Sequence, residues 1–320
     1  MRIGICYDRT EEYPHIDGPA DRFAEFEPES TIAAMQAAVR RCGHEPVLLG
    51  GPYALLAARP EVDLIWNIAE GYGTRNREGW VPTLCELYAI PFLGSDALTL
   101  SWSLDKALTK QLARSLDIPT ADWQVLGFDG SDLAGLTPSQ EAPLFIKPRY
   151  EGTAKGITES SIVHTSRQLA AEAGRLHALY RQDLLVERFL PGAEYTVAVT
   201  GAPLRCHPVL ERGVDAATGI GYHVMDGLGR AGAYRLENRL DGALEAALQG
   251  WSLRLCAAMG VRHFARLDFK CDAGGNPCFL EINPLPTFAI DNTFAILAEL
   301  EGVSYEEFLA GMLSGALSAL

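Results

Sequence analysis

Through the first hundred residues, short apolar runs bounded by turn residues alternate with longer stretches of helical periodicity. The short runs predict strands at residues 2–8, 46–50, 64–67 and 90–94. The longer stretches predict helices at residues 29–38 and 82–89, the first of them capped by Glu29 or Ser30. Alternation of strands and helices at this spacing is typical of an open α/β sheet.

The pattern changes after about residue 100, and coarse boundaries fall near residues 100 and 180. Helical periodicity predicts helices at 103–116, 166–180 and 241–259, and apolar runs predict strands at 143–148, 162–164, 184–189, 195–200, 264–270 and 278–283. The turn residues at 272–276 join the last two strands and predict a hairpin. Residues 211–235 are rich in glycine and irregular, which predicts a mobile loop.

Composition places the chain among globular proteins and excludes several partners. Its 320 residues suffice for about two domains, or for three small lobes that share one active site. The net charge of −14 argues against non-specific binding of nucleic acid or of an anionic membrane surface. No apolar stretch reaches the ~18 residues of a membrane span, and residues 308–320 are interpreted as a closing helix. The seven cysteines are scattered without a C-x-x-C pair, which predicts free thiols in a reducing cytosol.

Polar and apolar residues alternate on both strands of the predicted hairpin. Arg266 and Asp268 lie two residues apart, as do Glu281 and Asn283, so each pair shares one face of its strand and pairing would bring all four together. Their neighbours are expected to face a core: Leu267, Phe269, Leu280 and Ile282. Two carboxylates and an amide oxygen suit Mg²⁺ that carries phosphate ligands, and the arginine would neutralise a transferring phosphoryl group. The simpler alternative is a solvated face with an Arg–Asp pair, a contact that contributes only ~0.2–1 kcal/mol.

A second group of residues is cationic. Lys147 ends a predicted strand and precedes a loop of small residues at 151–157, whose backbone N–H groups could contact phosphate oxygens. Lys106 and Lys110 lie four residues apart on a predicted helix. The alternative is a glycine-containing hairpin turn with exposed lysines. The sequence contains no Walker A pattern, and no G-x-G-x-x-G follows the first strand, which argues against a P-loop enzyme and a dinucleotide site.

The strand at residues 185–189 ends in a Pro-Gly turn before Glu194 and forms a natural hinge segment. An adenine could pair with its exposed backbone, and Glu194 could accept hydrogen bonds from ribose hydroxyls. Considered alone, this stretch favours the simpler interpretation of Glu187 and Glu194 as two surface acids on a strand–turn–strand unit.

In order along the chain, these motifs resemble those of the ATP-grasp carboxylate–amine ligases, most closely the D-alanine–D-alanine ligase branch. They are Ser-Leu-Asp-Lys at 103–106, Ile-Lys-Pro at 146–148, Glu-Gly-Thr-Ala-Lys-Gly at 151–156, Val-Glu at 186–187, Glu194, Arg-Leu-Asp-Phe at 266–269 and Glu-Ile-Asn-Pro-Leu-Pro at 281–286. The resemblance covers most of the chain. It implies an ATP-grasp fold of the α/β class with α+β lobes: an open α/β sheet at 1–100, a small central lobe at 101–182, and a C-terminal lobe with an antiparallel sheet at 183–320.

The resemblance also implies roles for the matching residues. Arg266, Glu29 and Lys155 would act in catalysis, with Arg266 on a developing acyl phosphate and Glu29 on the amino group of the first substrate. ATP would contact Lys106, Lys147, Gly152, Thr153, Ala154 and Gly156 with its phosphates, Glu194 with its ribose, and Glu187, Phe189 and Leu190 with its base. Phe269 would also belong to the ATP-binding residues. Two Mg²⁺ ions, or Mn²⁺ in their place, would be held by Asp268, Glu281 and Asn283.

Departures from the family's pattern fall in the parts that face substrate, whereas the ATP motifs hold. Ala69-Glu70-Gly71 stands in place of a His-Gly, Thr153-Ala154 in place of Ser-Ser, Thr287 in place of a glycine, and residues 218–234 in place of a tyrosine-rich lid. Residues 9–27 are longer and more acidic than expected. We therefore expect substrates other than two D-alanines, with Glu70, Arg77, Tyr222 and Thr287 as candidate contacts.

The implied function is ATP-dependent ligation of a carboxylate to an amine through an acyl phosphate, with release of ADP and phosphate. An authentic D-alanine–D-alanine ligase of cell-wall synthesis is the alternative within the family. A nucleotide-binding protein without catalysis is the alternative outside it, and the complete set of metal, arginine and lysine residues argues against it. The resemblance further implies a cytoplasmic homodimer that acts on small-molecule acids and amines, although the residues themselves give no signal of an interface.

Overall fold

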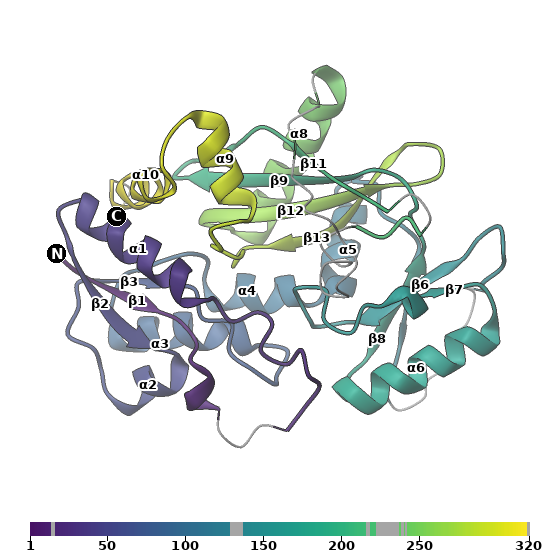
Figure 1. The fold of residues 1–320 in the computed structure, drawn as a ribbon, viewed down its shortest axis with the longest axis horizontal. Helices are drawn as coiled ribbons and strands as arrows, with labels where there is room; N and C mark the ends of the chain where they lie inside the picture. Colours follow the sequence, from purple (N-terminus) through teal and green to yellow (C-terminus); the bar gives the residue numbers. More distant parts are fainter. Residues whose placement is uncertain are drawn as a thin grey trace.

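The computed structural model describes residues 1–13, 17–128, 137–215, 218–221, 237, 240 and 242–318. These residues form three β-sheets, each with its own helices (Figure 1). Single 3₁₀ turns lie at Thr10–Glu12, Arg77–Gly79 and Glu159–Ser161.

The first sheet is parallel and has the strand order β2-β1-β3-β4. Its strands are β1 (Arg2–Cys6), β2 (Glu45–Gly50), β3 (Leu64–Asn67) and β4 (Phe92–Leu93). Successive side chains of a strand point to opposite faces, so Trp66 packs with α1 (Glu29–Arg41), whereas Ile65 packs with α2 (Pro52–Ala57) and α3 (Trp80–Tyr88). Helices on both faces of a parallel sheet confirm the α/β arrangement predicted for the first hundred residues.

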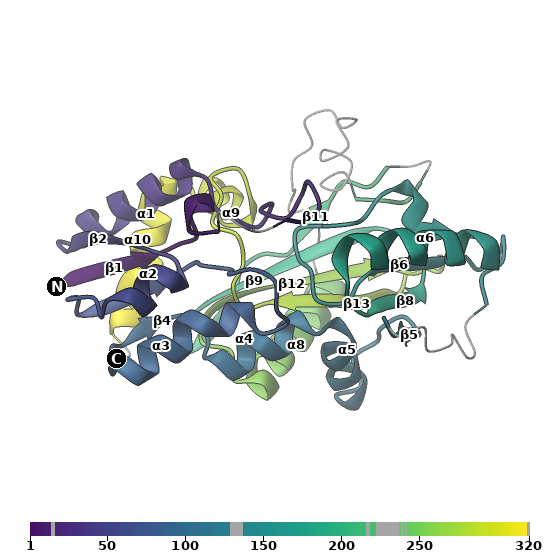
Figure 2. The ribbon, with the colours of Figure 1, turned by 90° about the horizontal axis from the view of Figure 1, so that it is seen from below.

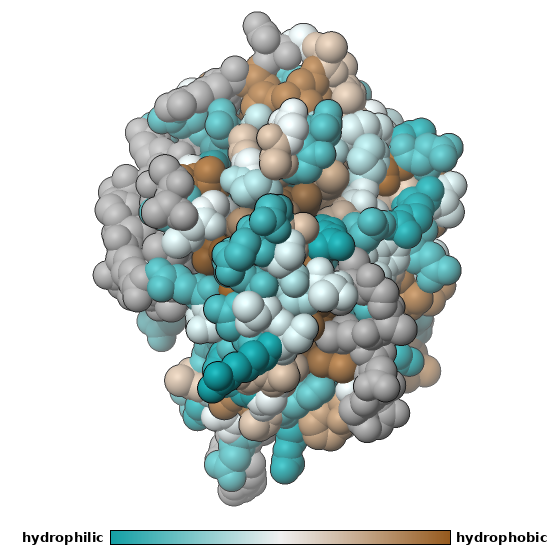
Figure 3. All heavy atoms as spheres, turned by 90° about the vertical axis from the view of Figure 1, so that its right-hand side faces the viewer, coloured by the Kyte–Doolittle hydropathy of each residue, from teal (hydrophilic) through white to brown (hydrophobic). Residues whose placement is uncertain are grey.

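The second sheet is antiparallel and has the order β5-β8-β6-β7. Its strands are β5 (Trp123–Leu126), β6 (Leu144–Pro148), β7 (Ile162–Val163) and β8 (Leu184–Arg188), and α6 (Ser166–Tyr180) packs on one face through Leu169 and Leu176. Because β8 begins at Leu184, the sheet extends past residue 182, where the sequence placed a lobe boundary. Seen from this end, the described surface is largely hydrophilic, and its hydrophobic side chains form separate small groups (Figure 3).

The third sheet has the order β10-β9-β12-β13, with β11 also paired to β9. Its strands are β9 (Glu194–Gly201), β10 (Leu204–Cys206), β11 (Leu210–Arg212), β12 (His263–Cys271) and β13 (Pro277–Asn283). One face packs on α8 (Gly242–Met259), whose Leu255 lies in one cluster with Leu267 of β12. Phe264 lies on the opposite face, which also carries Arg266 and Asp268 because these residues are spaced by two.

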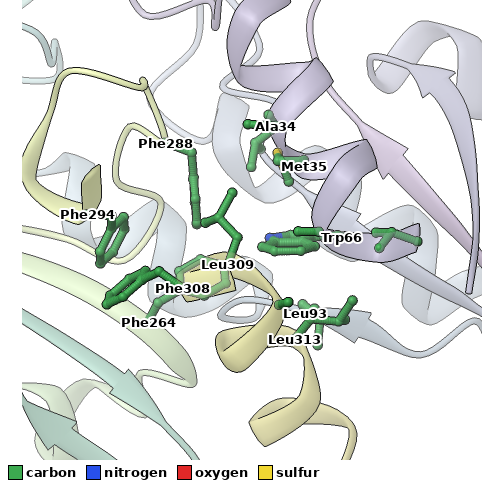
Figure 4. Close-up of a cluster of buried hydrophobic side chains, with 14 of the residues drawn as sticks. Ala34, Met35, Trp66, Leu93, Phe264, Phe288, Phe294, Phe308, Leu309 and Leu313 are labelled. Atoms are coloured by element: carbon green, nitrogen blue, oxygen red, sulfur yellow. The ribbon is translucent and has the colours of Figure 1, made fainter. Parts of the chain in front are cut away.

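The first and third sheets share a hydrophobic core formed with the C-terminal helices α9 (Thr293–Glu301) and α10 (Tyr305–Leu317). The ring centroid of Phe288 lies 5.9 Å from that of Trp66 in β3 and 5.2 Å from that of Phe264 in β12. Figure 4 shows these rings beside Leu309 and Leu313 of α10, and Figure 2 shows α10 lying next to α1. This core fixes the face of the third sheet that carries the polar residues against the first sheet.

Two predictions about helices are wrong. The single helix predicted at 103–116 is two helices, α4 (Ala97–Leu104) and α5 (Lys106–Ser115). Asp105 separates them because its carboxylate accepts hydrogen bonds from the backbone N–H groups of Ala107 and Leu108, at 3.1 and 3.2 Å, and so caps α5. Helix α1 begins as predicted, but its N-cap is Pro28 and no side chain caps it, because Glu29 and Ser30 already lie in the first turn.

The remaining predicted strands and helices match observed elements to within a few residues. Of the predicted mobile loop at 211–235, Arg212 ends β11, and most of the other residues lie outside the described part of the chain. None of the seven cysteines, all of which are described, forms a disulfide. No helix of the described ranges combines the length and apolar composition needed to cross a bilayer.

Candidate active site

The predicted hairpin brings its four polar side chains to one face of the third sheet. In the antiparallel register of β12 and β13, Asp268 lies opposite Glu281 and Arg266 lies opposite Asn283. Directly opposed residues of an antiparallel pair have Cβ atoms about 5 Å apart. The convergence inferred from the spacing is therefore confirmed.

Two predictions about residues beside this patch are wrong, and a bulge explains the first of them. The register shifts after Asp268, where Phe269 pairs with Phe279 and leaves Leu280 as the extra residue. Leu280 therefore lines a cavity beside the patch instead of the core. Phe269 is fully buried in the core, on the side of β12 away from Asp268, so its side chain cannot contact a nucleotide as predicted.

Asp268 is surrounded by groups that favour its charged form. Its carboxylate lies 3.0 Å from a guanidinium nitrogen of Arg266 and 3.9 Å from one of Arg212, and it accepts a hydrogen bond from the hydroxyl of Thr196 at 2.6 Å. Burial acts to raise the pKa of Asp268, but the two arginines and the hydrogen bonds outweigh it and lower the pKa below its usual value. Asp268 is therefore an anion at neutral pH.

The lysines of the cationic group are buried and paired, so the alternative of exposed lysines is wrong. Glu187 lies between two of them, with its carboxylate oxygens 2.7 Å from the Nζ of Lys110 and 2.8 Å from the Nζ of Lys147. Burial acts to raise the pKa of Glu187, yet the two ammonium groups lower it to about 2. Lys106 lies 3.7 Å from the carboxylate of Glu281. Lys110 is fully buried and serves to hold Glu187.

A first cavity, between the second and third sheets, collects most of the predicted ATP-binding residues. Its wall is formed by β6, the loop after β6, β8 and the polar face of the hairpin. The predicted residues that line it are Lys106, Lys147, Gly152, Thr153, Ala154, Lys155, Glu187, Phe189, Leu190, Glu194, Arg266, Asp268 and Glu281. Gly156 does not line the cavity, because it lies at the far end of the loop.

A second cavity adjoins the first and reaches the first sheet. The segment before α1 contributes to it, together with Glu70, Asn283 at the end of β13, and Thr287 in the chain that follows. The two cavities share part of their wall, at Lys106, Glu151, Gly152, Thr153, Ala154, Arg266 and Glu281. A group bound in one cavity can therefore meet a group bound in the other.

Of the two acids near the start of α1, Glu27 lines the second cavity, whereas Glu29, which was predicted to contact substrate, does not. Glu29 is exposed in the first turn of α1 and lines neither cavity. Glu27 lines the second cavity, where it accepts hydrogen bonds from the backbone N–H of Phe288 at 2.6 Å and from the hydroxyl of Thr31 at 3.0 Å. Burial raises the pKa of Glu27 above its usual value despite these bonds. Residue spacing alone does not distinguish the two acids, since they lie only two residues apart.

The candidate substrate contacts fall into three groups. Glu70 and Thr287 line the second cavity, and burial together with the neighbouring Glu78 raises the pKa of Glu70. Arg77 is buried away from both cavities and pairs with Glu25, so its predicted contact with substrate is wrong. Tyr222 lies outside the described residues.

Sequence reasoning missed several charged residues of the two cavities. Lys270 lines the first cavity and donates to the carboxylate of Glu194 at 3.1 Å; its spacing of two from Asp268 could have revealed it. Arg212 lines the second cavity and lies opposite Glu194 in the pairing of β11 with β9. No local pattern in the sequence predicts this pairing. Glu25 was missed because its contacts with Arg77, Gly152 and Lys155 lie 52, 127 and 130 residues away in the chain.

Comparison with known proteins agrees with this geometry. The family model described as D-ala D-ala ligase C-terminus matches residues 112–314. A D-alanine–D-alanine ligase of Syntrophotalea carbinolica is 32% identical over 290 residues, which cover 89% of this chain and 90% of the relative. The chain belongs to the D-alanine–D-alanine ligase family. A family member from Stutzerimonas stutzeri is 30% identical over 291 residues, covering 90% of this chain and 88% of the relative.

Solved structures of this family share the fold. The D-alanine–D-alanine ligase of Bacillus anthracis complexed with ATP has a TM-score of 0.73 to this chain at 20% identity, and the alignment covers 100% of this chain and 98% of that one. The VanG D-Ala:D-Ser ligase of Enterococcus faecalis has a TM-score of 0.72 at 18% identity, covering 98% of each chain. These structures confirm the predicted ATP-grasp fold. The class of ATP-dependent carbon–nitrogen ligases is confirmed by the family model and the relatives.

Proposed function

We propose that this enzyme uses ATP to activate the carboxylate of one small molecule and then joins it to the amine of another. The observation that carries the proposal is the wall shared by the two cavities. Lys106, Arg266 and Glu281 line both, so a terminal phosphate in the first cavity and a carboxylate in the second would meet beside two cations. Cations at the position where charge is transferred stabilise a phosphoryl transition state.

The first cavity offers surfaces that suit the base and the phosphates of ATP. Phe189 and Leu190 supply apolar surface for the base, and Lys147 supplies positive charge for the phosphates. The backbone at Thr153 and Ala154 has positive φ values of 47° and 54°, and such turns present successive N–H groups to an anion. We therefore keep the assignment that the resemblance implies: the base to Phe189 and Leu190, the ribose to Glu194, and the phosphates to Lys147 and the loop.

Residues on and beside the shared wall fit magnesium. Asp268 lines the first cavity, Asn283 lines the second and Glu281 lines both, and they offer two carboxylates and an amide oxygen on one face of the hairpin. Mg²⁺ is usually bound by one or two carboxylates together with phosphates and water, and not by a closed protein cage. Asp268, Glu281 and Asn283 would hold the metal, which when bound supplies positive charge to the phosphates.

The reaction follows from the chemistry of carboxylates. A carboxylate is a poor acyl donor because oxide is a poor leaving group. Its oxygen attacks the terminal phosphorus of ATP, the bond from that phosphorus to the bridging oxygen breaks, and ADP leaves. An amine then attacks the acyl phosphate, phosphate leaves, and the amine loses a proton. Arg266, buried beside Asp268, would stay next to the phosphoryl group through both steps, while the protein keeps water away from the intermediate.

The second cavity favours a substrate with an amino group. Glu27, Glu70 and Glu78 line it, and among the described residues none of the three forms an ion pair. Together with Thr287 in place of a glycine, this wall supports substrates other than two D-alanines. The cytoplasmic location and the homodimer implied by the resemblance stay predictions.

A screen of ADP release over D- and L-amino acids, alone and in pairs, tests the proposed specificity. We expect ADP release with a pair that contains at least one compound other than D-alanine. Dominant activity with D-alanine alone would support the authentic cell-wall enzyme instead, and the absence of ADP release with every pair would favour the non-catalytic alternative.

Replacing Glu27 with glutamine is expected to lower kcat/KM for the amino-bearing substrate by about tenfold or more, since a hydrogen bond to a charged group contributes ~1.5–3 kcal/mol. The wild-type kcat/KM should also fall as pH falls through the raised pKa of Glu27, because protonation removes the charge that attracts an ammonium. Steady-state kinetics against pH would show both effects. Glu29→Gln is the matched control, and an equal loss in that exposed variant would return the role to Glu29.

A further inference from the structure

Two acids of the segment before α1, residues 17–28, have no role in the proposed function: Asp21 and Glu25, which contact the loop at residues 151–156. We call this loop the phosphate loop. The backbone N–H of Gly152 donates to the carboxylate of Glu25 at 2.9 Å, and the N–H of Gly156 donates to the carboxylate of Asp21 at 3.0 Å. A Cβ atom on Gly152 would lie 2.5 Å from a Glu25 oxygen, so this close approach requires glycine. The segment therefore holds both ends of the phosphate loop.

Buried cations fix Glu25 in this position. Arg77 donates two hydrogen bonds to its carboxylate, at 2.8 and 2.9 Å, and a third to the backbone oxygen of Tyr150 at 2.9 Å. Lys155 pairs with both Glu25 and Glu151. Burial acts to raise the pKa of Glu25, but Arg77 and Lys155 lower it to about 2, so the carboxylate is charged at neutral pH.

The segment is itself firmly attached to the rest of the protein. The ring of Phe26 lies 4.9 Å from that of Phe23 and 5.3 Å from that of Tyr13, in an aromatic cluster beside the first sheet. The hydroxyl of Tyr180, at the end of α6, donates to Asp21 at 2.6 Å. The segment thus connects the first sheet to the second, and its purple trace before α1 lies between them (Figure 1).

The tip of the phosphate loop, in contrast, is left available. Within the described residues, the amide N–H groups of Thr153 and Ala154 have no hydrogen-bond acceptor, and both residues line the two cavities. A carboxylate that took the place of phosphate would occupy these tip amides and lie in the first cavity. Glu25 lines only the second cavity and Asp21 lines neither. The contacts therefore anchor the loop and do not block it.

We propose that Asp21 and Glu25 are positioning residues that hold the ends of the phosphate loop, so that its two tip amides face the terminal phosphates of the bound nucleotide. The inference rests on the proposed use of ATP. A loop already held in its binding conformation loses less conformational entropy on binding, which strengthens the affinity for the group that it contacts. The adenosine part of the nucleotide, which does not reach the loop, gains nothing from these contacts.

Calorimetric titration with AMP-PNP and with AMP, both in magnesium buffer, tests this. Glu25→Gln is expected to raise the Kd for AMP-PNP about tenfold or more and to change the Kd for AMP by less than twofold, since AMP lacks the terminal phosphates. Asp17→Asn, which removes an exposed acid near the same segment, is the matched control and should leave both constants unchanged. Hydrogen exchange at the peptide that contains Gly152 and Gly156 should become faster in Glu25→Gln.

An unchanged Kd for AMP-PNP in Glu25→Gln would overturn the proposal. A lower Kd would mean that the carboxylate competes with phosphate, and equal losses for AMP-PNP and AMP would mean a merely structural role; both results also overturn it. If Glu25→Gln fails to fold, Tyr180→Phe and Asp21→Asn decide, with a smaller loss confined to AMP-PNP expected. Failure of the wild type to bind AMP-PNP would instead contradict the proposed function.

Discussion

Replacing Glu281 with alanine is expected to lower kcat by about a hundredfold to a thousandfold while changing the Kd for AMP by less than twofold. Glu281 lines both cavities, lies opposite Asp268 and is 3.7 Å from Lys106. Its loss removes a proposed metal ligand and leaves Lys106 without this partner at the position where charge is transferred. Losing a single group that stabilises the transition state typically costs ~10²–10³ in rate. The base-binding end of the first cavity is formed by other residues and should be unaffected.

Steady-state ADP release and calorimetric titration with AMP would measure the two quantities. Glu86→Ala, an exposed acid on α3, is a suitable control for the loss of one carboxylate and should behave as the wild type. Unchanged turnover in the Glu281 variant would remove the assignment of this residue to the metals. Loss of AMP binding as well would indicate that the variant disturbs the fold of the hairpin.

Replacing Glu187 with glutamine is expected to have the largest effect on stability, lowering the free energy of unfolding by about 3 kcal/mol or more. The substitution leaves the ammonium groups of Lys110 and Lys147 in a buried site without their anion. Removing one partner of a buried ion pair typically costs ~3–5 kcal/mol because the other charge remains desolvated. Urea unfolding at pH 7 would measure the loss.

The pH dependence of stability provides a second test of the same cluster. The pKa of Glu187 is lowered from 4.5 to about 2 in the folded chain. A carboxyl group whose folded pKa is depressed adds stability above its unfolded pKa, and this contribution disappears as pH falls through the folded value. The wild type should therefore lose stability between about pH 4.5 and 2, and Glu187→Gln should show less of this loss.

The exposed pair of Arg114 and Asp122, whose charged atoms lie 2.9 Å apart, supplies the control for the Glu187 experiment. Asp122→Asn is expected to change the free energy of unfolding by no more than about 0.5 kcal/mol, because surface ion pairs contribute little. A similar small effect in Glu187→Gln would mean that solvent reaches the cluster and that the two lysines are not constrained by Glu187.

Local patterns in the sequence predicted most of the fold. Helix α6 was predicted at its observed limits, and the hairpin of β12 and β13 was predicted with the correct face for Arg266 and Asp268. These predictions succeeded because periodicity and turn residues act over a few positions. The break at Asp105 was missed because an aspartate that caps a helix can equally well lie within one, and only the backbone geometry decides.

The candidate site was less predictable wherever it depends on contacts between distant segments. The bulge that turns Leu280 toward the first cavity has no sequence signal of its own. The choice of Glu27 over Glu29 depends on where α1 begins relative to the chain after β13. The contact between Glu25 and Gly152 joins residues that lie 127 positions apart in the chain, and no local pattern links them.

Transfer of ¹⁸O from substrate to phosphate would reveal whether the reaction passes through an acyl phosphate. The enzyme would be incubated with ATP, magnesium and amino acids labelled with ¹⁸O in their carboxyl groups, and the released phosphate would be examined by ³¹P NMR. If the carboxylate attacks the terminal phosphorus, each released phosphate should carry one ¹⁸O atom, and ADP should be the nucleotide product. Unlabelled phosphate would identify simple hydrolysis of ATP, and release of AMP with pyrophosphate would identify an adenylate; either result would contradict the acyl-phosphate route.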